Sequence, residues 1–321
     1  MSGVTVRLAF WNTWLLSPRL WGTGPRIPGS KGWFAPEVEA RTPLVAKAVA
    51  NRFDVAALGE VFETSELDVL EASWPEATLV RGPGPKRPRL QGSGLATFVG
   101  PDTLVLRSAS HIYRSGGDLR DSDTYATKGA LLTTVRYHPD LPPLDLFSTH
   151  LLAGGELFPI PGANDTRRHH VARMAQVDEL IGFIERTHDP SHILMVVGDF
   201  NVIGGTPEYE DLATHMDRAK LKDVWPNNGI GPGPTCTFTD PSQLPPDPDE
   251  PDMVLDSELD EAGERLDYIW LRSPESLTIE AERPRRWAFG DRGVQGGPAG
   301  SLSDHLAIST TLHIQARGSQ A

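Results

Sequence analysis

The sequence predicts an α/β fold in which short strands alternate with amphipathic helices. Apolar stretches of strand length recur along the chain, and residues 42–53 and 164–186 carry apolar side chains at helical spacing. Residues 193–197 are apolar throughout, which is typical of a strand buried on both faces. Polar residues follow several of these strands, which is where layered α/β folds build their sites.

The charge and the cysteine content of the chain argue against some classes of function. The 321 residues carry a formal net charge of −13, and the pI is about 5.2. This balance argues against tight binding of long nucleic acids, which requires basic surface, although a nuclease with a local basic groove stays open. Cys236 is the single cysteine, so neither a disulfide within the chain nor a Cys-rich zinc site is expected.

The chain start indicates an intracellular protein. Val4, Val6, Leu8 and Phe10 alternate as in a strand, and no charged region followed by an apolar region precedes them. No run of about 18 apolar residues is present, so no membrane span is expected. We therefore expect a cytoplasmic location, with secretion open for a chain that has lost a leader.

In the first half, residues 4–11 predict a strand, and residues 17–36 predict a long loop rich in Trp, Arg, Gly and Pro. Thr42 and Pro43 are typical of the N-cap and first turn of a helix. Residues 81–94 form a basic Pro/Gly stretch and predict a loop. Further strands are expected at residues 54–60, 94–99, 104–107, 129–137 and 144–149.

In the second half, a helix is expected over residues 164–186 and another from Thr206–Pro207 through Met216. Residues 229–260 predict a loop with a Pro/Asp-rich part at 240–256. The remaining strands are expected at residues 193–197, 266–271 and 306–312.

Six short segments carry residues suited to catalysis. Each of them alone is compatible with a turn, a cap or a solvated strand end. They are Asn12 in FWNTW, Glu60 in LGEVF, His150 in FSTHL, Asp199 and Asn201 in VVGDFN, Asp267 in RLDYIW, and Asp304 and His305 in LSDHL.

Together and in this order, the segments resemble the motif series of the endonuclease/exonuclease/phosphatase superfamily. GDFN followed by LDYIW and SDH is the most specific part of the resemblance, which covers about residues 4–313. It implies a four-layer α/β sandwich, with two packed mixed β-sheets flanked by helices and the motif residues at one end. It also implies one catalytic domain, with residues 314–321 as a flexible tail.

By this resemblance, Glu60 is the main ligand of Mg²⁺, with Asn12 and Asp304 close to the ion directly or through water. Oxygen donors of this kind suit Mg²⁺, which is commonly held by one or two carboxylates; Mn²⁺ or another divalent cation stays an alternative. Many relatives carry Gln before the Glu, whereas this chain has Gly59. The replacement of Gln by Gly59 keeps the metal ligand Glu60. It puts in doubt a neighbouring contact with the substrate or with the groups that support the metal ligands.

The resemblance also implies the catalytic roles. Asp199 would orient or deprotonate the attacking water, and Asn201 would donate to a phosphate oxygen. His305 would contact the phosphate or act as acid/base, with Asp267 orienting its ring. His150 would donate a further hydrogen bond. Phosphoester hydrolysis needs this combination of an in-line nucleophile and stabilised phosphate oxygens.

Three details favour the sphingomyelinase-like branch: Lys128 before Gly129, the run STHLLA and the phrase CTFTDP. Lys128 would help to hold a phosphate, or it is a solvated lysine at a strand end. The loop of residues 17–36 would touch a membrane surface, or it folds over the sheet as a lid, or it is a flexible insert. No obligate protein partner is evident.

Four functions follow from this reasoning. The favoured one is hydrolysis of a sphingomyelin-like phospholipid or another small phosphodiester. A DNA endonuclease or exonuclease would need a basic strip beside the site. An inositol or sugar phosphate phosphatase would need a cationic pocket. A binding protein without activity would require loss of the motif residues, all of which are present.

Overall fold

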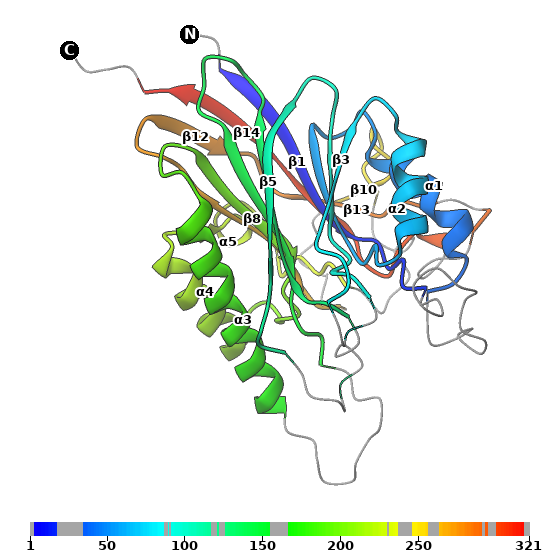
Figure 1. The fold of residues 1–321 in the computed structure, drawn as a ribbon. Helices are drawn as coiled ribbons and strands as arrows, with labels where there is room; N and C mark the ends of the chain where they lie inside the picture. The colour runs from blue at the N-terminus through cyan, green and yellow to red at the C-terminus, as the bar shows by residue number, and fades with distance from the viewer. Residues whose placement is uncertain are drawn as a thin grey trace.

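Two mixed β-sheets packed face to face form the centre of the computed structural model, and helices cover their outer faces (Figure 1). This is the predicted four-layer α/β sandwich. The structure describes residues 3–17, 35–86, 89, 91–116, 121, 126–154, 166–229, 231–236, 246–255, 263–290, 293–294 and 300–317.

The first sheet has the strand order β10-β13-β14-β1-β2-β4-β3, and β12 pairs with β14. Its neighbouring strands β1 and β2 are parallel, and the other pairs are antiparallel. The strands are β1 (Val4–Asn12), β2 (Val55–Gly59), β3 (Thr78–Arg81), β4 (Ala96–Val99), β10 (Met253–Val254), β12 (Leu277–Ala281), β13 (Arg285–Trp287) and β14 (Ala307–Ala316).

The second sheet has the order β5-β6-β7-β8-β11-β9. Here β7 and β8 are the parallel pair. The strands are β5 (Leu104–Ile112), β6 (Gly129–Arg136), β7 (Leu144–His150), β8 (Ile193–Asp199), β9 (Lys222–Asp223) and β11 (Asp267–Arg272).

Three apolar layers hold the sandwich together. The inner layer lies between the sheets and contains Phe10, Leu146 and Val197. The helices α1 and α2 cover the first sheet, whereas α3 and α4 cover the second. Their bounds are α1 (Val38–Val49), α2 (Thr64–Ser73), α3 (Thr166–Thr187) and α4 (Pro207–Arg218), and a short α5 (Trp225–Asn228) follows β9.

The two predicted Thr–Pro helix starts differ in outcome. Thr206 is an N-cap that accepts a hydrogen bond from the Tyr209 backbone N–H, with Pro207 as the first helical residue, so that prediction is confirmed. The other start is wrong, because α1 begins at Val38 and has Pro43 inside it. The first turn of α1 is buried at Val38 and Arg41, so its packing outweighs the preference of proline for a helix start.

Several boundaries also differ from those predicted. Strand β5 continues to Ile112 instead of ending near residue 107. Strand β14 continues to Ala316, and Ile314 pairs with Val4, so residues 314–316 belong to the sheet and not to a tail. Helix α2 was not predicted, because its buried residues are only Glu66 and Leu70 and give a weak helical pattern.

A buried carboxylate lies at the start of β7. The side chain of Asp145 is fully buried and accepts hydrogen bonds from the His188 Nδ1 at 2.9 Å, the Asp189 backbone N–H and the Thr134 hydroxyl. The His192 Nδ1 lies 3.3 Å from the same carboxylate. This cluster joins the second sheet to the segment that follows α3.

Some predictions lie outside the described residues. These are most of the Trp/Arg-rich loop, at residues 18–34, and parts of the Pro/Asp-rich segment, at residues 240–245 and 256. Within the described part of the chain, no helix is both long and apolar enough to cross a membrane.

Candidate active site

The strand register brings the predicted site residues to one end of the sandwich. Asn12 and Gly59 are paired at the ends of the parallel strands β1 and β2. His150 and Asp199 are paired at the ends of β7 and β8, and Asp267 pairs with Asp199 from the start of β11. Residues at the carboxyl ends of parallel strands therefore meet from both sheets.

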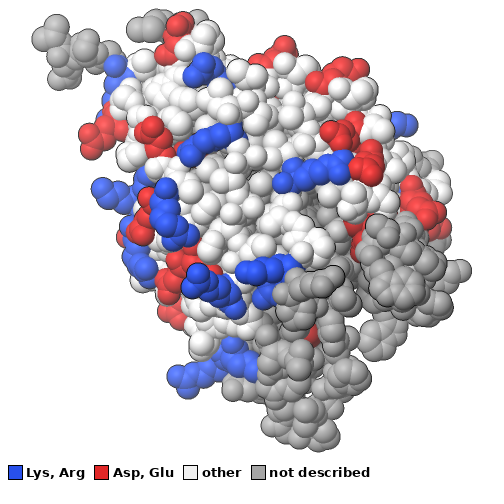
Figure 2. All heavy atoms as spheres, viewed as in Figure 1, with Lys and Arg blue, Asp and Glu red and all other residues white. Residues whose placement is uncertain are grey.

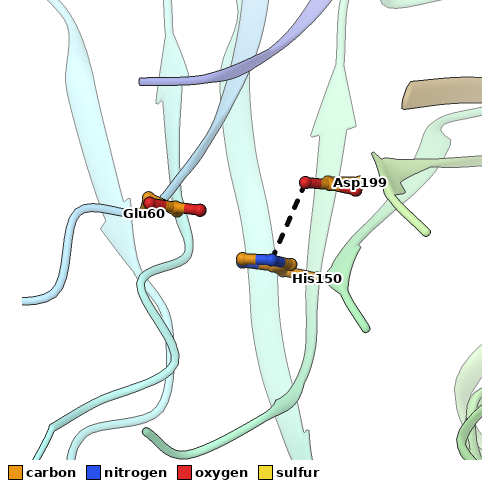
Figure 3. A group of neighbouring side chains, drawn as sticks. All are labelled: Glu60, His150 and Asp199. Atoms are coloured by element: carbon orange, nitrogen blue, oxygen red, sulfur yellow. Dashed lines mark ion pairs between the residues drawn. The ribbon is translucent and has the colours of Figure 1, made fainter. Parts of the chain in front are cut away.

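Glu60, His150 and Asp199 form the group drawn in Figure 3. His150 and Asp199 come from adjacent strands of the second sheet, and Glu60 follows β2 of the first sheet. The His150 Nε2 lies 3.7 Å from the Asp199 Oδ2, and each residue offers a ligand atom within 4.8 Å of the others. The backbone of Glu60 has φ +60°, an unfavourable conformation for a non-glycine residue that is common at functional sites.

Asn12 connects two of these carboxylates. Its Nδ2 donates to the Glu60 Oε1 at 3.0 Å and to the Asp199 Oδ2 at 2.9 Å. Its Oδ1 accepts the Trp14 backbone N–H at 3.1 Å. In this arrangement Asn12 orients Glu60 and Asp199 through its nitrogen, and direct ligation of a metal through Oδ1 would require the amide to turn over.

The electrostatics of Glu60 and Asp304 fit a cation. Burial and the nearby Asp304 raise the pKa of Glu60 to about 7, although Asn12, His305 and Lys128 oppose this shift. Burial raises the pKa of Asp304 as well. Two partly buried carboxylates that lie close together repel each other's negative charge, and a divalent cation that prefers oxygen ligands would stabilise both of them. This acidic and histidine cluster can therefore hold a divalent metal ion.

His305 and Asp267 form a buried hydrogen-bonded pair. The His305 Nδ1 lies 2.8 Å from the Asp267 Oδ2, and its Nε2 lies 3.9 Å from the Asp199 Oδ2. Burial would lower the pKa of His305, but the charge and hydrogen bond of Asp267 raise it well above its usual value. Because a carboxylate only accepts, Nδ1 donates to Asp267 and Nε2 is left to exchange a proton.

His150 has the opposite electrostatic environment. Burial and the charge of Lys128 lower the pKa of His150 to about 3, so its ring is neutral near pH 7. Lys128 is itself buried, and its charge also favours the ionised form of Glu60. The site thus contains one histidine that holds a proton and one that stays neutral, with Lys128 close to both Glu60 and His150.

Asn201 stabilises the turn after β8. Its backbone N–H donates to the Asp199 Oδ1 at 2.9 Å, and its φ of +51° is in the left-handed region. Its Nδ2 donates to the Leu151 carbonyl at 3.2 Å, next to His150. The predicted contact of Asn201 with a phosphate oxygen stays a prediction.

Glycines allow close backbone contacts beside the site. A Cβ atom at Gly198 would lie 2.2 Å from the Thr149 carbonyl oxygen, so glycine lets β8 approach β7 just before Asp199. A Cβ at Gly59 would lie 3.2 Å from the Phe10 ring. A larger side chain at position 59 would therefore press against the Phe10 ring.

Two supporting residues were not identified from the sequence. Arg41 is fully buried and donates to the carbonyls of Pro36, Thr13, Trp14 and Leu302, which lie on segments flanking Asn12 and Asp304. Burial lowers the pKa of Arg41 to about 10.

The hydroxyl of Ser303 donates to the Asn12 carbonyl at 2.7 Å and accepts the His305 backbone N–H at 3.1 Å. Ser303 and Arg41 both act on backbone groups far away in sequence, which a local motif does not reveal.

Comparisons with known proteins agree with this arrangement. The sequence profile described as "Endonuclease/Exonuclease/phosphatase family" matches residues 9–305. The chain therefore belongs to the endonuclease/exonuclease/phosphatase family, a class of metal-dependent phosphoesterases and nucleases. A comparison with curated proteins found no match.

Solved structures share the fold over nearly the whole chain. Sphingomyelinase C from Streptomyces griseocarneus has a TM-score of 0.64 at 16% identity, with 96% of this chain and 99% of that chain covered. A beta toxin mutant from Staphylococcus aureus with bound magnesium ions has 0.63 at 18%, with coverage of 96% and 99%. The endonuclease/exonuclease/phosphatase from Bacteroides vulgatus has 0.62 at 18%, with coverage of 97% and 100%.

Proposed function

We propose that this chain is a Mg²⁺-dependent phosphodiesterase that hydrolyses a sphingomyelin-like phospholipid or a similar small phosphodiester. One observation carries the reaction type: both sheets bring Glu60, His150, Asp199 and the Asp267–His305 pair to the same end of the sandwich. This set combines a cation site, a candidate base and two histidines, as hydrolysis of a phosphate ester requires.

The cation would be held by Glu60 and Asp304, with Asn12 orienting Glu60. A bound divalent ion supplies Lewis-acid stabilisation of the negative charge on phosphate oxygens. Mg²⁺ and Mn²⁺ both prefer oxygen ligands, so the choice of Mg²⁺ rests on the carboxylate donors and on the magnesium-bound structural relative.

Side chains of this chain would activate the water, donate a proton and bind the phosphate oxygens. Asp199 accepts hydrogen bonds from Asn12 and Asn201 and lies near both histidines, and it would orient the attacking water and take its proton. His305 holds a proton at Nε2 and would donate it toward the phosphate or the leaving oxygen. The neutral His150 would add a hydrogen bond to a phosphate oxygen as charge develops.

Three features support a small or lipid diester over a polynucleotide. The net charge is −13, and basic and acidic side chains are interspersed on the described part of the face drawn in Figure 2. Lys128 is buried beside the site and supplies a local positive charge. One structural relative is a sphingomyelinase C.

The test is a hydrolysis panel with Mg²⁺, each reaction repeated with EDTA. The substrates are sphingomyelin in mixed micelles, a lysophospholipid, bis-p-nitrophenyl phosphate, plasmid DNA, an abasic duplex and inositol phosphates. His305→Ala, purified identically, controls for contaminating hydrolases. His313→Ala is the matched control. His313 lies in β14, the strand that follows His305, but it is partly exposed and pairs with Glu282.

Turnover of sphingomyelin that disappears with EDTA and in His305→Ala, but not in His313→Ala, would support the proposal. DNA nicking without lipid turnover would assign the chain to the nuclease branch instead. Absence of turnover on every substrate would contradict the proposed hydrolysis.

A further inference from the structure

A short segment at Thr235 and Cys236 lies between the two parts of the chain that carry the Asp267–His305 pair. Cys236 forms isolated antiparallel bridges with Glu264 on one side and with His305 on the other. The backbone N–H groups of Thr235 and Cys236 both donate to the Glu264 carbonyl at 2.9 Å. The segment therefore links the start of β11 to the start of β14.

Thr235 makes this link with two different groups. Its hydroxyl oxygen accepts the backbone N–H groups of Leu266 and Asp267, both at 3.1 Å. Its carbonyl oxygen accepts the Leu306 backbone N–H at 2.7 Å. Because Thr235 is fully buried, water does not compete for these hydrogen bonds. One residue thus fixes the backbone next to both members of the pair.

The Asp267 carboxylate has few other contacts that orient it. Its Oδ2 is bonded to the His305 Nδ1 at 2.8 Å, whereas its Oδ1 is buried without a hydrogen-bond partner among the described residues. A carboxylate held at one oxygen depends on its backbone for its position. The hydroxyl of Thr235 supplies that backbone anchor.

We infer that Thr235 is a positioning residue that keeps Asp267 and His305 in register for catalysis. The inference rests on the proposed phosphoester hydrolysis, in which His305 acts. Thr235 does not contact the reacting atoms, so its removal should slow the chemical step and leave substrate binding nearly unchanged.

The test compares Thr235→Val, which keeps the shape and removes the acceptor, with Thr235→Ser, which keeps the acceptor. With bis-p-nitrophenyl phosphate and Mg²⁺, we expect Thr235→Val to lower kcat by about 10- to 100-fold, as loss of a supporting hydrogen bond does at other sites. KM should change by less than about twofold, because only the transition state loses stabilisation. Thr235→Ser should keep kcat within about threefold of the wild type.

Thr133→Val is the matched control. Thr133 is a fully buried threonine in β6, and its hydroxyl has no hydrogen-bond partner among the described residues. The same loss of a hydroxyl there should leave kcat unchanged. An equal fall of kcat in Thr133→Val and Thr235→Val would overturn the inference.

A double-mutant cycle separates positioning from general destabilisation. If Thr235 acts through Asp267, Thr235→Val should have little further effect in an Asp267→Asn background. Equal losses in both backgrounds would contradict the inference. Should Thr235→Val not fold, Thr235→Cys, which keeps a weaker acceptor of similar size, takes its place in the same cycle.

A spectroscopic readout does not depend on activity. The Nδ1 proton of His305, hydrogen-bonded to a buried carboxylate, should give a downfield proton resonance that is lost in Asp267→Asn. The resonance should shift or broaden in Thr235→Val and persist in Thr133→Val. An unchanged resonance in Thr235→Val refutes the positioning role, whereas an inactive wild type with the expected changes refutes only the proposed hydrolysis.

Discussion

Removal of the buried Asp145 carboxylate should change how stability depends on pH. Burial alone would raise the pKa of Asp145, but hydrogen bonds from His188, Thr134, His192 and the Asp189 backbone lower it to about 2. Relative to the ordinary value of 3.8, this shift corresponds to about 2 kcal/mol of folding free energy at neutral pH. Asp145→Asn should therefore lower the free energy of unfolding by at least about that amount.

The sign follows from the depressed pKa. The folded state binds the Asp145 proton less readily than the unfolded state does, so this stabilisation is complete above about pH 4 and is lost as the pH falls toward about 2. The difference in stability between wild type and Asp145→Asn should shrink by roughly 1 kcal/mol between pH 6 and pH 3.

Urea unfolding at several pH values, followed by tryptophan fluorescence, measures this difference. Asp140→Asn is the control, because Asp140 is an exposed residue on the turn before β7. The free energy of unfolding of Asp140→Asn, plotted against pH, should run parallel to that of the wild type. If the difference in free energy of unfolding between Asp145→Asn and the wild type stays constant from pH 6 to pH 3, the reasoning is refuted.

Three further predictions concern the site. Glu60→Gln should raise the Mg²⁺ concentration needed for half-maximal activity, with unchanged circular dichroism; activity as high as the wild type at limiting Mg²⁺ would remove Glu60 from the metal site. His305→Ala should lower kcat by about 10²- to 10⁴-fold and should also lower Tm, because the buried Asp267 carboxylate loses its hydrogen-bond partner; near-normal turnover would contradict the role of His305. Lys128→Met should raise KM for a phosphodiester more than it lowers kcat, and unchanged steady-state kinetics would exclude substrate contact by Lys128.

Short-range patterns were sufficient to predict most of the central strands and the placement of the motif residues. Residues 193–197 were identified as a buried strand from their apolar run, and β8 contains them. His150 and Asp199 end adjacent parallel strands, so once both strands are predicted their proximity follows from the register. The individual catalytic and metal roles stay predictions until they are measured.

The supporting contacts could not be predicted, because they join parts of the chain that are far apart in sequence. Arg41 binds the Leu302 carbonyl, 261 residues away, and Ser303 binds the Asn12 carbonyl, 291 residues away. The amide of Asn12 was expected near a metal through its oxygen, whereas its nitrogen faces Glu60 and Asp199. Hydrogen-bond direction depends on all neighbours together, and no single motif contains them.

The pairing of Val4 with Ile314 has a practical consequence for work with this protein. The start of β1 and the end of β14 lie side by side, at the end of the sandwich away from the strand ends that carry the site (Figure 1). A tag, fluorophore or surface tether attached at either end would therefore point the site away from the attachment point. A short linker between the two ends would give a circular permutant whose new termini can be chosen elsewhere, with β1 and β14 still paired.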